Sequence, residues 1–398
     1  MRLSKLFTRT TRENPADEVS VNAQLLERGG FVYKNSAGIY TYMPLGFRVL
    51  EKIKAIIREE MNAVGGTEML MPALIDKKYY EAAGRADIKV GFKTGDDNFI
   101  LGWSHEEILT AMAGRYTSSY HDLPFAAYQF QTKFRNEARA KSGLLRGREF
   151  LMKDMYSFHA DEGDFLDYYA KVGEAYRKIF ERCGLKAYYT VAAGGDFTTS
   201  NTHEFQVLTK AGEDLILLCP KCSWAINTEI ADEKSCPKCG EELVEEKSIE
   251  VGNIFPLGTK YSEALNLQFT DAAGEKKHVV MGCYGIGLSR VLGTVVEVHH
   301  DDRGMIWPRT LAPFRAHLIA LPGGEQEAEK LYDPGSMLYD DRPDKSAGEK
   351  FADADLIGCP IRLVVSKKTL EHQGIEVKKR GAEESKIVPL TELAAMLQ

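Results

Sequence analysis

The sequence of 398 residues lacks the features that mark membrane, secreted or low-complexity proteins. No apolar run approaches the roughly 18 residues that a membrane span requires. The start of the chain is basic, but the apolar core of a signal peptide does not follow it. We therefore expect a globular protein of the cytoplasm with no membrane partner. Its length is sufficient for two or three domains.

An excess of positive charge is also absent, since the formal net charge is −7 at pH 7. Contact with nucleic acid would therefore need a local basic patch. One such patch lies within residues 133–153. Only two acidic residues, Glu137 and Glu149, occur in this segment. Its basic residues are Lys133, Arg135, Arg139, Lys141, Arg146, Arg148 and Lys153. A solvated loop would explain it, but the flanking strand pattern and the glycines favour a binding site.

The seven cysteines lack the even, scattered spacing of a secreted disulfide framework. Four of them form two Cys-Pro-Lys-Cys units separated by thirteen residues. This spacing is typical of a closed, structural zinc site, in which each of two turns presents two thiolates. Free thiols or a redox pair are the alternatives. The expected Zn²⁺ ligands are Cys219, Cys222, Cys236 and Cys239.

The two common phosphate-binding loops are missing as well. The chain has no G-x-x-x-x-G-K-[ST] segment, and Arg290 replaces the third glycine of a dinucleotide fingerprint in residues 282–290. A cation at the start of a helix costs up to about 1 kcal/mol unless an anion binds there. A second arginine, Arg135, lies on the charged face of a predicted strand whose other face is apolar. Two arginines on separate elements predict a polyphosphate held at both ends, although the glycine motif alone is equally well explained as a packing turn.

Hydrophobic periodicity divides the chain near residue 312, where an alternation of strands and helices begins. The predicted helices cover residues 50–64, 164–183, 288–298, 325–332, 347–357 and 390–397. The predicted strands cover residues 67–72, 126–136, 149–153, 203–208, 214–218, 277–281, 316–321, 336–339 and 361–365. The nucleotide site is expected on an antiparallel sheet.

A hydroxyl and two carboxylates lie close together in residues 103–107. Glu106 could bind a substrate ammonium or imino group. Spacing alone favours a plain helix start, in which Ser104 is the N-cap and the acids occupy the first turn. A histidine and a glutamate on a strand are also more often structural than functional, and spacing alone gives the same interpretation for His203 and Glu204.

Together these segments resemble the class II prolyl-tRNA synthetases of the bacterial type, from Ser4 to the C-terminus. The three class II motifs are matched by residues 44–72, 130–154 and 283–290, and the cysteine that begins the third is specific to the proline enzymes. Further signatures are matched by residues 203–205, 250–255, 339–342 and 350–355. The resemblance implies an α/β protein with an α+β catalytic domain of mainly antiparallel sheet at residues 1–311. A zinc-ribbon-like insertion at 215–248 and a small α/β anticodon-binding domain at 312–398 complete it.

The same resemblance implies a homodimeric ligase that activates L-proline with ATP and Mg²⁺ and transfers it to tRNA(Pro). Arg135 would hold the α-phosphate and the proline carboxylate, Glu137 would contact adenine, and Arg290 would pair with the γ-phosphate. These three are the expected catalytic residues. The implied proline site comprises Ser104, Glu106, Arg135, His203, Glu204 and Cys283. The implied nucleotide site comprises Arg135, Glu137, Arg146, Gly147, Gly285, Arg290 and Glu250, the last as a magnesium ligand.

The sequence departs from the family pattern in four places. The interval between the second and third motifs is too short for the editing insertion of many bacterial relatives, so we expect alanyl-tRNA not to be cleared in cis. Ser104 replaces a threonine, and Thr198-Thr199 replace a glycine pair. Residues 330–339 form a short segment, which predicts a truncated first helix in the anticodon domain. A catalytically silent sensor, a zinc-ribbon nucleic-acid adaptor and a ligase for threonine or glycine are the alternatives.

Overall fold

The computed structural model describes residues 1–138, 140, 142–232 and 234–393, which form two compact units. One unit comprises residues 1–35, 40–52 and the described part of 295–398, and the other comprises 36–39 and 53–294. Arg139 and Lys141 of the predicted basic patch, and the end of the predicted final helix, lie outside the described residues. A helix of sufficient length and apolarity to cross a membrane is not found in the described chain.

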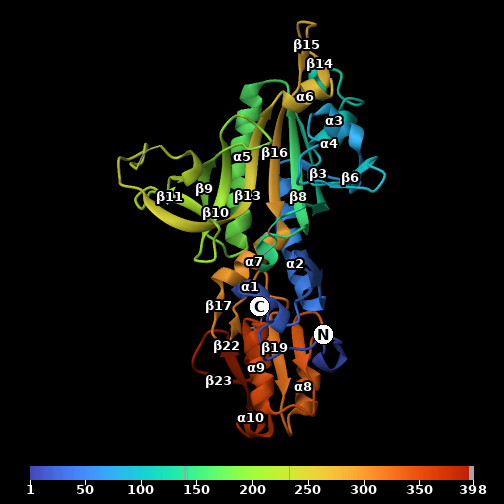
Figure 1. Ribbon diagram of the computed structural model, residues 1–398. Helices are drawn as coiled ribbons and strands as arrows, with labels where there is room; N and C mark the ends of the chain where they lie inside the picture. The colour runs from blue at the N-terminus through green and yellow to red at the C-terminus, as the bar shows by residue number, and fades with distance from the viewer. Residues whose placement is uncertain (139, 141, 233, 394–398) are drawn as a thin grey trace. The chain divides into compact units, whose positions relative to one another are not determined.

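A nine-stranded sheet forms the centre of the second unit (Figure 1). Four long strands pair antiparallel in the order β13 (Val244–Gly258), β16 (Val280–Gly287), β8 (Glu149–His159) and β7 (Phe125–Phe134). The short β3 (Gly66–Glu68) extends the sheet parallel to β7. The predicted mainly antiparallel sheet is therefore confirmed.

The other end of this sheet closes on itself. Its additional strands are β9 (Ala187–Ala192), β10 (Thr202–Leu208), β11 (Asp214–Leu218) and β12 (Ala225–Asn227). β10 pairs with both β9 and β13, while β12 joins β9 to β11 and β11 pairs with β13. Ser248 pairs with Leu208 on one edge of β13 and with Asp214 on the other, so these five strands form a small closed barrel. Both strands that flank the cysteine motifs belong to it.

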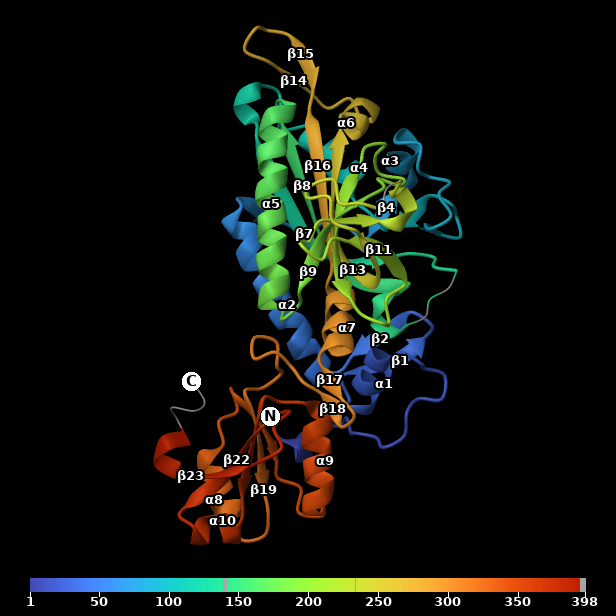
Figure 2. The same cartoon turned by 90° about the vertical axis from the view of Figure 1, so that its left-hand side faces the viewer.

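Helices cover both faces of the long strands. The helix α5 (Glu162–Arg182) contacts β8, β13 and β16 along one face (Figures 1 and 2). It buries Phe165, Tyr169, Val172, Tyr176, Ile179 and Phe180, at the helical spacing that predicted it. On the opposite face, α4 (Glu106–Ala113) and α6 (Lys260–Ala264) share a core with Tyr156, Phe255 and Met281. The remaining elements of this unit are α3 (Lys77–Ala82), β4 (Leu74–Asp76), β5 (Phe92–Lys93), β6 (Phe99–Leu101), β14 (Gln268–Thr270) and β15 (Lys276–His278).

Several predictions for this sheet were wrong. The strand expected at 67–72 is the three-residue β3, and the one expected at 277–281 is split between β15 and β16. The glycine motif is not a packing turn, because it forms the C-terminal half of β16. A side chain at Gly282 would lie 2.7 Å from Phe165 of α5, so glycine lets the helix approach the strand. The fifteen-residue β13 was not predicted, because its exposed first half and buried second half do not alternate.

The first unit contains a five-stranded sheet in the order β20-β19-β21-β22-β23. Its strands β19 (Ala316–Ala320), β20 (Met337–Asp340) and β21 (Ile361–Val365) are parallel, as the strand–helix alternation predicts. The antiparallel strands β22 (Gly374–Lys379) and β23 (Lys386–Pro389) were not predicted. The helices are α8 (Glu325–Leu331), α9 (Ala347–Ile357) and α10 (Lys367–Glu371), and the described start of the predicted final helix is a 3-10 turn at Leu390–Glu392.

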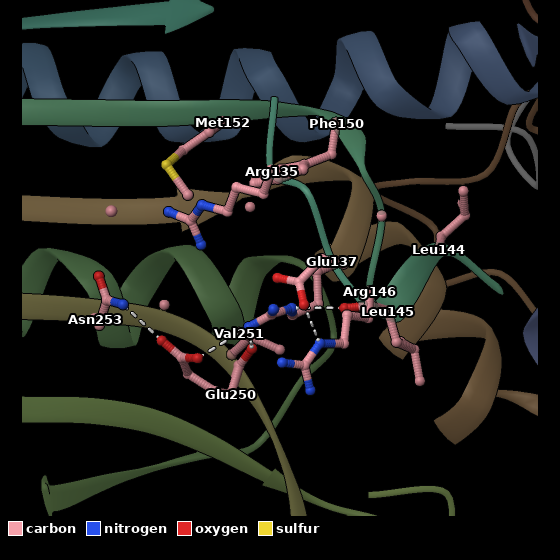
Figure 3. A pocket seen from close by; sticks show the side chains of 15 residues that line it. Arg135, Glu137, Leu144, Leu145, Arg146, Phe150, Met152, Glu250, Val251 and Asn253 are labelled. Carbon is pink, nitrogen blue, oxygen red and sulfur yellow. Dashed lines mark hydrogen bonds and ion pairs between the residues drawn. The ribbon is translucent and has the colours of Figure 1, made fainter. Parts of the chain in front are cut away.

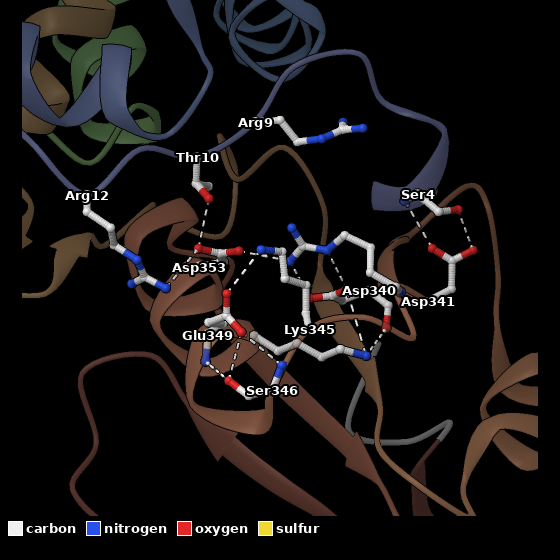
Figure 4. A network of polar contacts seen from close by, with 12 residues as sticks. Ser4, Arg9, Thr10, Arg12, Asp340, Asp341, Lys345, Ser346, Glu349 and Asp353 are labelled. Atoms are coloured by element: carbon white, nitrogen blue, oxygen red, sulfur yellow. Dashed lines mark hydrogen bonds and ion pairs between the residues drawn. The ribbon is translucent and has the colours of Figure 1, made fainter.

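The N-terminal residues also belong to this unit. Arg2 forms a parallel bridge with Tyr339, and the Ser4 hydroxyl donates to Asp341 Oδ2 over 2.8 Å. The Thr10 hydroxyl donates to Asp353 over 2.8 Å, and Figure 4 shows this contact together with that of Ser4 and Asp341. The segment thus covers one edge of the five-stranded sheet. This unit also contains α1 (Val21–Arg28), most of β1 (Val32–Ser36) and β2 (Ile39–Tyr42), and the two-residue strands β17 (His300–Asp301) and β18 (Gly304–Met305). The helices α2 (Pro44–Ala63) and α7 (Leu288–Val298) are divided between the two units.

Candidate functional site

A cavity lies where the ends of β7, β8 and β16 meet the middle of β13 (Figure 3). The first turn of α7 and the residues between β7 and β8 complete its wall. Its lining includes all seven residues of the predicted nucleotide set. They are Arg135, Glu137, Arg146, Gly147, Gly285, Arg290 and Glu250. We call this space the first cavity.

Arg135 reaches into the first cavity without a carboxylate partner. It forms no ion pair with any described residue, and its buried Nε has no hydrogen-bond partner there. Burial lowers the pKa of Arg135, and the positive charge of Arg290 lowers it further. A desolvated guanidinium without a counter-charge is stabilised by a bound anion. Arg135 and Arg290, 155 positions apart in the sequence, thus present positive charge to the same cavity.

Arg290 is held by the opposite wall. Its Nε donates to the Leu145 carbonyl over 2.8 Å, and its Nη1 donates to Glu250 Oε2 over 2.9 Å. Glu250 Oε1 accepts a bond of 2.6 Å from Asn253 Nδ2. Figure 3 shows Arg135 on one side of the cavity and Glu250 on the other. The cavity thus offers two arginines to the negative charges of a ligand and one carboxylate to a cation that binds with it.

Two further residues of the predicted set form an ion pair at the rim. Arg146 Nε donates to Glu137 Oε2 over 2.9 Å. Its Nη1 lies 3.3 Å from Glu213 Oε2, on the residue that precedes β11 in the sequence. Gly285 needs to lack a side chain, because a Cβ there would lie 2.9 Å from Asn253 Oδ1 and narrow the cavity. These contacts give the rim charged groups of both signs.

A second cavity adjoins the first. Its lining residues are Trp103, Ser104, Glu106, Lys133, Arg135, Met152, Asp154, Tyr156, Phe197, Asn253, Phe255, Cys283 and Gly285. Arg135 is among the residues common to both cavities. A ligand in the second cavity and a ligand in the first can therefore meet at this guanidinium.

Glu106 supplies a negative charge in the second cavity. The Cys283 thiol donates to Glu106 Oε1 over 3.1 Å, and Arg85 Nη1 lies 3.2 Å from Oε2. Burial alone would raise the pKa of Glu106, but the attraction of Arg85 and the hydrogen bonds to the carboxylate together outweigh burial and lower the pKa. The carboxylate is thus available to a ligand ammonium. The prediction that Ser104 caps this helix was wrong, because α4 begins at Glu106 and its N-cap is His105, without a side-chain cap bond.

A buried polar network lies beside Glu106. Lys133 Nζ is 2.8 Å from Asp154 Oδ2 and 2.5 Å from His105 Nδ1. Burial lowers the pKa of His105 to about 4, so the ring is neutral at pH 7. Its Nδ1 then accepts from Lys133, and its Nε2 donates to the Pro72 carbonyl over 3.0 Å. Lys133 is therefore a paired cation within the network.

The predicted residues His203 and Glu204 lie apart from both linings as far as the described residues define them. The His203 ring stacks on Tyr189 with centroids 4.2 Å apart and bonds the Tyr169 hydroxyl over 3.0 Å. Burial lowers the pKa of His203 to about 4. Burial, with the charge of Glu250, raises the pKa of Glu204 to about 8. Both side chains belong to the closed barrel.

Sequence reasoning assigned no role to Arg85, His105 or Asp154. It placed Lys133 in the basic patch, but the structure buries this lysine completely. Arg85 contacts Glu106 from a loop 21 positions earlier, and no periodic pattern or motif marks it. The partners of Lys133 are Asp154 on β8 and His105 before α4, two segments that only the fold brings to this lysine.

The four predicted metal ligands converge at one end of the barrel. Their ligand atoms all lie within 4.8 Å of one another, and the printed contacts between sulfurs measure 3.4, 3.5 and 3.7 Å. Zn–S bonds of about 2.3 Å at tetrahedral angles would separate the sulfurs by about 3.8 Å. Ser223 and Gly240, one position after each motif, both have left-handed backbones with φ of 59° and 73°. The two turns are therefore alike, and the donor set fits a four-thiolate metal site.

Comparisons with known proteins show the family of this chain. Residues 89–299 match the family described as "tRNA synthetase class II core domain (G, H, P, S and T)", and residues 324–398 match "Anticodon binding domain". The curated "Proline--tRNA ligase" of Moorella thermoacetica is 33% identical over 563 residues, covering 100% of this chain and 98% of that protein. The enzyme of the same name from Wolbachia sp. subsp. Drosophila simulans is 37% identical over 416 residues, covering 98% of both.

Solved structures share the fold at lower identity. The Giardia lamblia prolyl-tRNA synthetase in complex with prolyl-adenylate aligns with a TM-score of 0.77 and 21% identity. The alignment covers 94% of this chain and 75% of that one.

Proposed function

The chain belongs to the proline--tRNA ligases, class II enzymes that activate proline with ATP and charge its tRNA, and we propose that Arg135 joins the two substrates in this reaction. ATP would occupy the first cavity and proline the second. The observation that carries the assignment is that Arg135, a buried cation without an ion pair in the described chain, lines both cavities.

The first chemical step needs positioning and charge stabilisation more than proton transfer. The carboxylate of proline is ionised at pH 7 and attacks the α-phosphorus of ATP, while pyrophosphate leaves. Arg135 would bind the carboxylate and the α-phosphate, and Arg290 the γ-phosphate, as charge develops on the phosphate oxygens. Glu106 would accept the secondary ammonium of proline, and Glu137 would contact adenine.

Glu250 is our proposed ligand for Mg²⁺. Its carboxylate lines the first cavity opposite Arg135, and an oxygen ligand at this position suits a hard cation. Mg²⁺ bound there would supply charge neutralisation for the phosphates. Gly285 leaves room for the nucleotide, because a Cβ there would lie 2.9 Å from Asn253 Oδ1, and Gly147 lines the same cavity.

The remaining finer assignments are also proposals. In the second step a hydroxyl of the terminal tRNA adenosine would attack the prolyl-adenylate, with the described basic residues near 142–148 facing the acceptor end. Residues 312–398 would bind the anticodon, and 1–311 would be the catalytic domain. His203 and Glu204 would then shape the proline site indirectly, through β10. A homodimer and a cytoplasmic location stay predictions.

Pyrophosphate exchange into ATP tests the proposed function directly. The purified protein is assayed with proline, alanine, threonine and glycine in turn. We expect rapid exchange with proline, slow exchange with alanine and none with the other two. Folded protein that binds ATP but supports no exchange with any of them would instead favour the silent sensor.

The first prediction concerns editing. The alignment with the Moorella enzyme spans 563 positions against 398 residues here, so at least 165 of its positions have no counterpart in this chain. A proline pocket discriminates poorly against alanine, because missing methylenes are worth only about 1–3 kcal/mol. We expect the enzyme to form alanyl-tRNA(Pro) and to leave it intact beyond its spontaneous hydrolysis. Rapid enzyme-dependent deacylation of isolated alanyl-tRNA(Pro) would contradict this.

The second prediction concerns the metal, which we propose to be Zn²⁺. It would link the end of β11, at Cys219, to the start of β13, after Cys239. Cys222 is exposed, so Cys222→Ser removes a ligand without disturbing a core. We expect zinc content to fall from about one ion per chain to well below that value, with faster amide exchange in residues 214–248.

The matched control is Cys183→Ser, which changes a buried cysteine that is not part of the four-sulfur cluster. This variant is expected to keep its zinc. Equal zinc content in both variants and the parent would show that these sulfurs do not hold the ion.

A further inference from the structure

Arg85 is a buried cation that contacts Glu106. It follows α3, and only 3% of its surface is exposed. Its Nη1 lies 3.2 Å from Glu106 Oε2 and 2.6 Å from Glu107 Oε1. The guanidinium carbon is 4.1 Å from the centre of the Trp103 ring. Arg85 is not part of either lining, whereas Glu106 and Trp103 line the second cavity.

We propose that Arg85 is a positioning residue for proline recognition, which holds Glu106 ionised and oriented so that this carboxylate accepts the secondary ammonium of the substrate. The inference rests on the proposed function, since it assumes that proline occupies the second cavity. It assigns to Arg85 an action through Glu106, with no contact to the substrate.

The reason is the cost of a buried charge. Glu106 is 1% exposed, and a carboxylate in such a position favours its neutral form unless a cation is close. A neutral carboxyl group would offer no ion pair to an ammonium ion. Within the described chain Arg85 is the cation in ion-pair contact with Glu106.

The second carboxylate, Glu107, competes for the same cation. Burial raises the pKa of Glu107 to about 7, so it is partly protonated at neutral pH, while the pKa of Glu106 is lowered. Glu107 is absent from the lining of the second cavity as described. The two neighbours thus differ in charge state and in access to a substrate, which makes Glu107 a suitable control.

The stacking against aromatic rings fixes the direction of the guanidinium. Besides Trp103, the rings of Phe197 and Tyr261 lie 4.9 and 5.4 Å from the guanidinium carbon. A planar cation between rings keeps its orientation better than a flexible ammonium. Glu106 is then held between Arg85 on one side and the Cys283 thiol on the other.

Steady-state pyrophosphate exchange of Arg85→Met, Arg85→Lys and Glu107→Gln tests the proposal. For Arg85→Met we expect the KM for proline to rise about 30-fold or more and the KM for ATP to change less than about 3-fold. For Glu107→Gln we expect both constants to stay within about 3-fold, because Glu106 keeps its cation. Arg85→Lys, which retains the charge, should recover most of the proline affinity.

A pH series adds a readout that a merely structural role would not move. In Arg85→Met the KM for proline should fall as pH rises from 6 to 9, because Glu106 without its cation ionises only at higher pH. The parent enzyme should change much less over this range. The other ionisable groups close to Glu106 are present in both proteins: Tyr80, His105, Glu107, Lys133, Arg135, Tyr156, Lys260, Tyr261 and Cys283.

The outcomes separate the inference from the function on which it rests. A parent protein without proline-dependent exchange would overturn the proposed function. An active parent, with equal losses for proline and ATP in Arg85→Met and no pH effect, would overturn the role of Arg85 alone. If Arg85→Met does not fold, the smaller change Arg85→Gln takes its place, and a KM for proline within about 3-fold of the parent value in that variant would do the same.

Discussion

Arg135→Ala is expected to reduce proline-dependent pyrophosphate exchange by at least about 10³-fold. This arginine lines both cavities, so its loss removes charge stabilisation from the carboxylate and from the α-phosphate together. We expect the KM values for proline and for ATP to rise as well as kcat to fall. Steady-state exchange kinetics with each substrate varied in turn measure all three.

Stability is the companion measurement for this variant. Because no described residue forms an ion pair with Arg135, its removal leaves no unpaired carboxylate, and the unfolding midpoint should fall by a few degrees at most. Arg146→Ala serves as the control, since its side chain is 46% exposed and paired at the rim. Its activity should fall no more than about tenfold. An active Arg135→Ala enzyme would refute the assignment of both cavities.

Glu106→Gln is expected to reduce kcat/KM for proline by between about 30-fold and several thousand-fold. The amide keeps the shape of the side chain but cannot form an ion pair with the substrate ammonium. Glu106 lines the second cavity and is absent from the first as described, so the KM for ATP should stay within about 3-fold. Exchange kinetics at saturating ATP and at saturating proline separate the two effects.

This selectivity distinguishes Glu106 from Arg135. A loss that falls equally on ATP and proline would mean that Glu106 supports the fold of the whole site. ATP affinity measured by calorimetry without proline gives an independent check. An unchanged affinity there, beside a large loss for proline, is the expected result.

The comparison of sequence and structure shows where local patterns suffice. The helix at 162–182 and the strands β19, β20 and β21 follow from periodicity, because each buries one continuous stripe or run of apolar side chains. The strand β13 does not follow from periodicity, because its surroundings change along its length. Its first residues pair with β11 in the barrel, and its last residues pair with β16 in the long part of the sheet.

The functional residues divide in the same way. Motifs pointed to Arg135, Arg290, Glu106 and Cys283, since charge and glycine at unusual positions are visible in the sequence itself. Spacing chose the wrong N-cap, because it does not encode the geometry of a turn. The resemblance implied His203 for the proline site, but the structure places it outside the described linings, because a motif does not give the direction of a side chain.

The amino-acid sequence by itself determined the family, the two arginines and the four cysteines, because these depend on residue identity and short spacing. Only the tertiary structure decided that Arg135 is common to two cavities and that Arg85 lies against Glu106. The ionisation of a buried carboxylate depends on which charges the folded chain brings within a few ångströms, and that proximity arises from strand pairing and loop packing between distant segments.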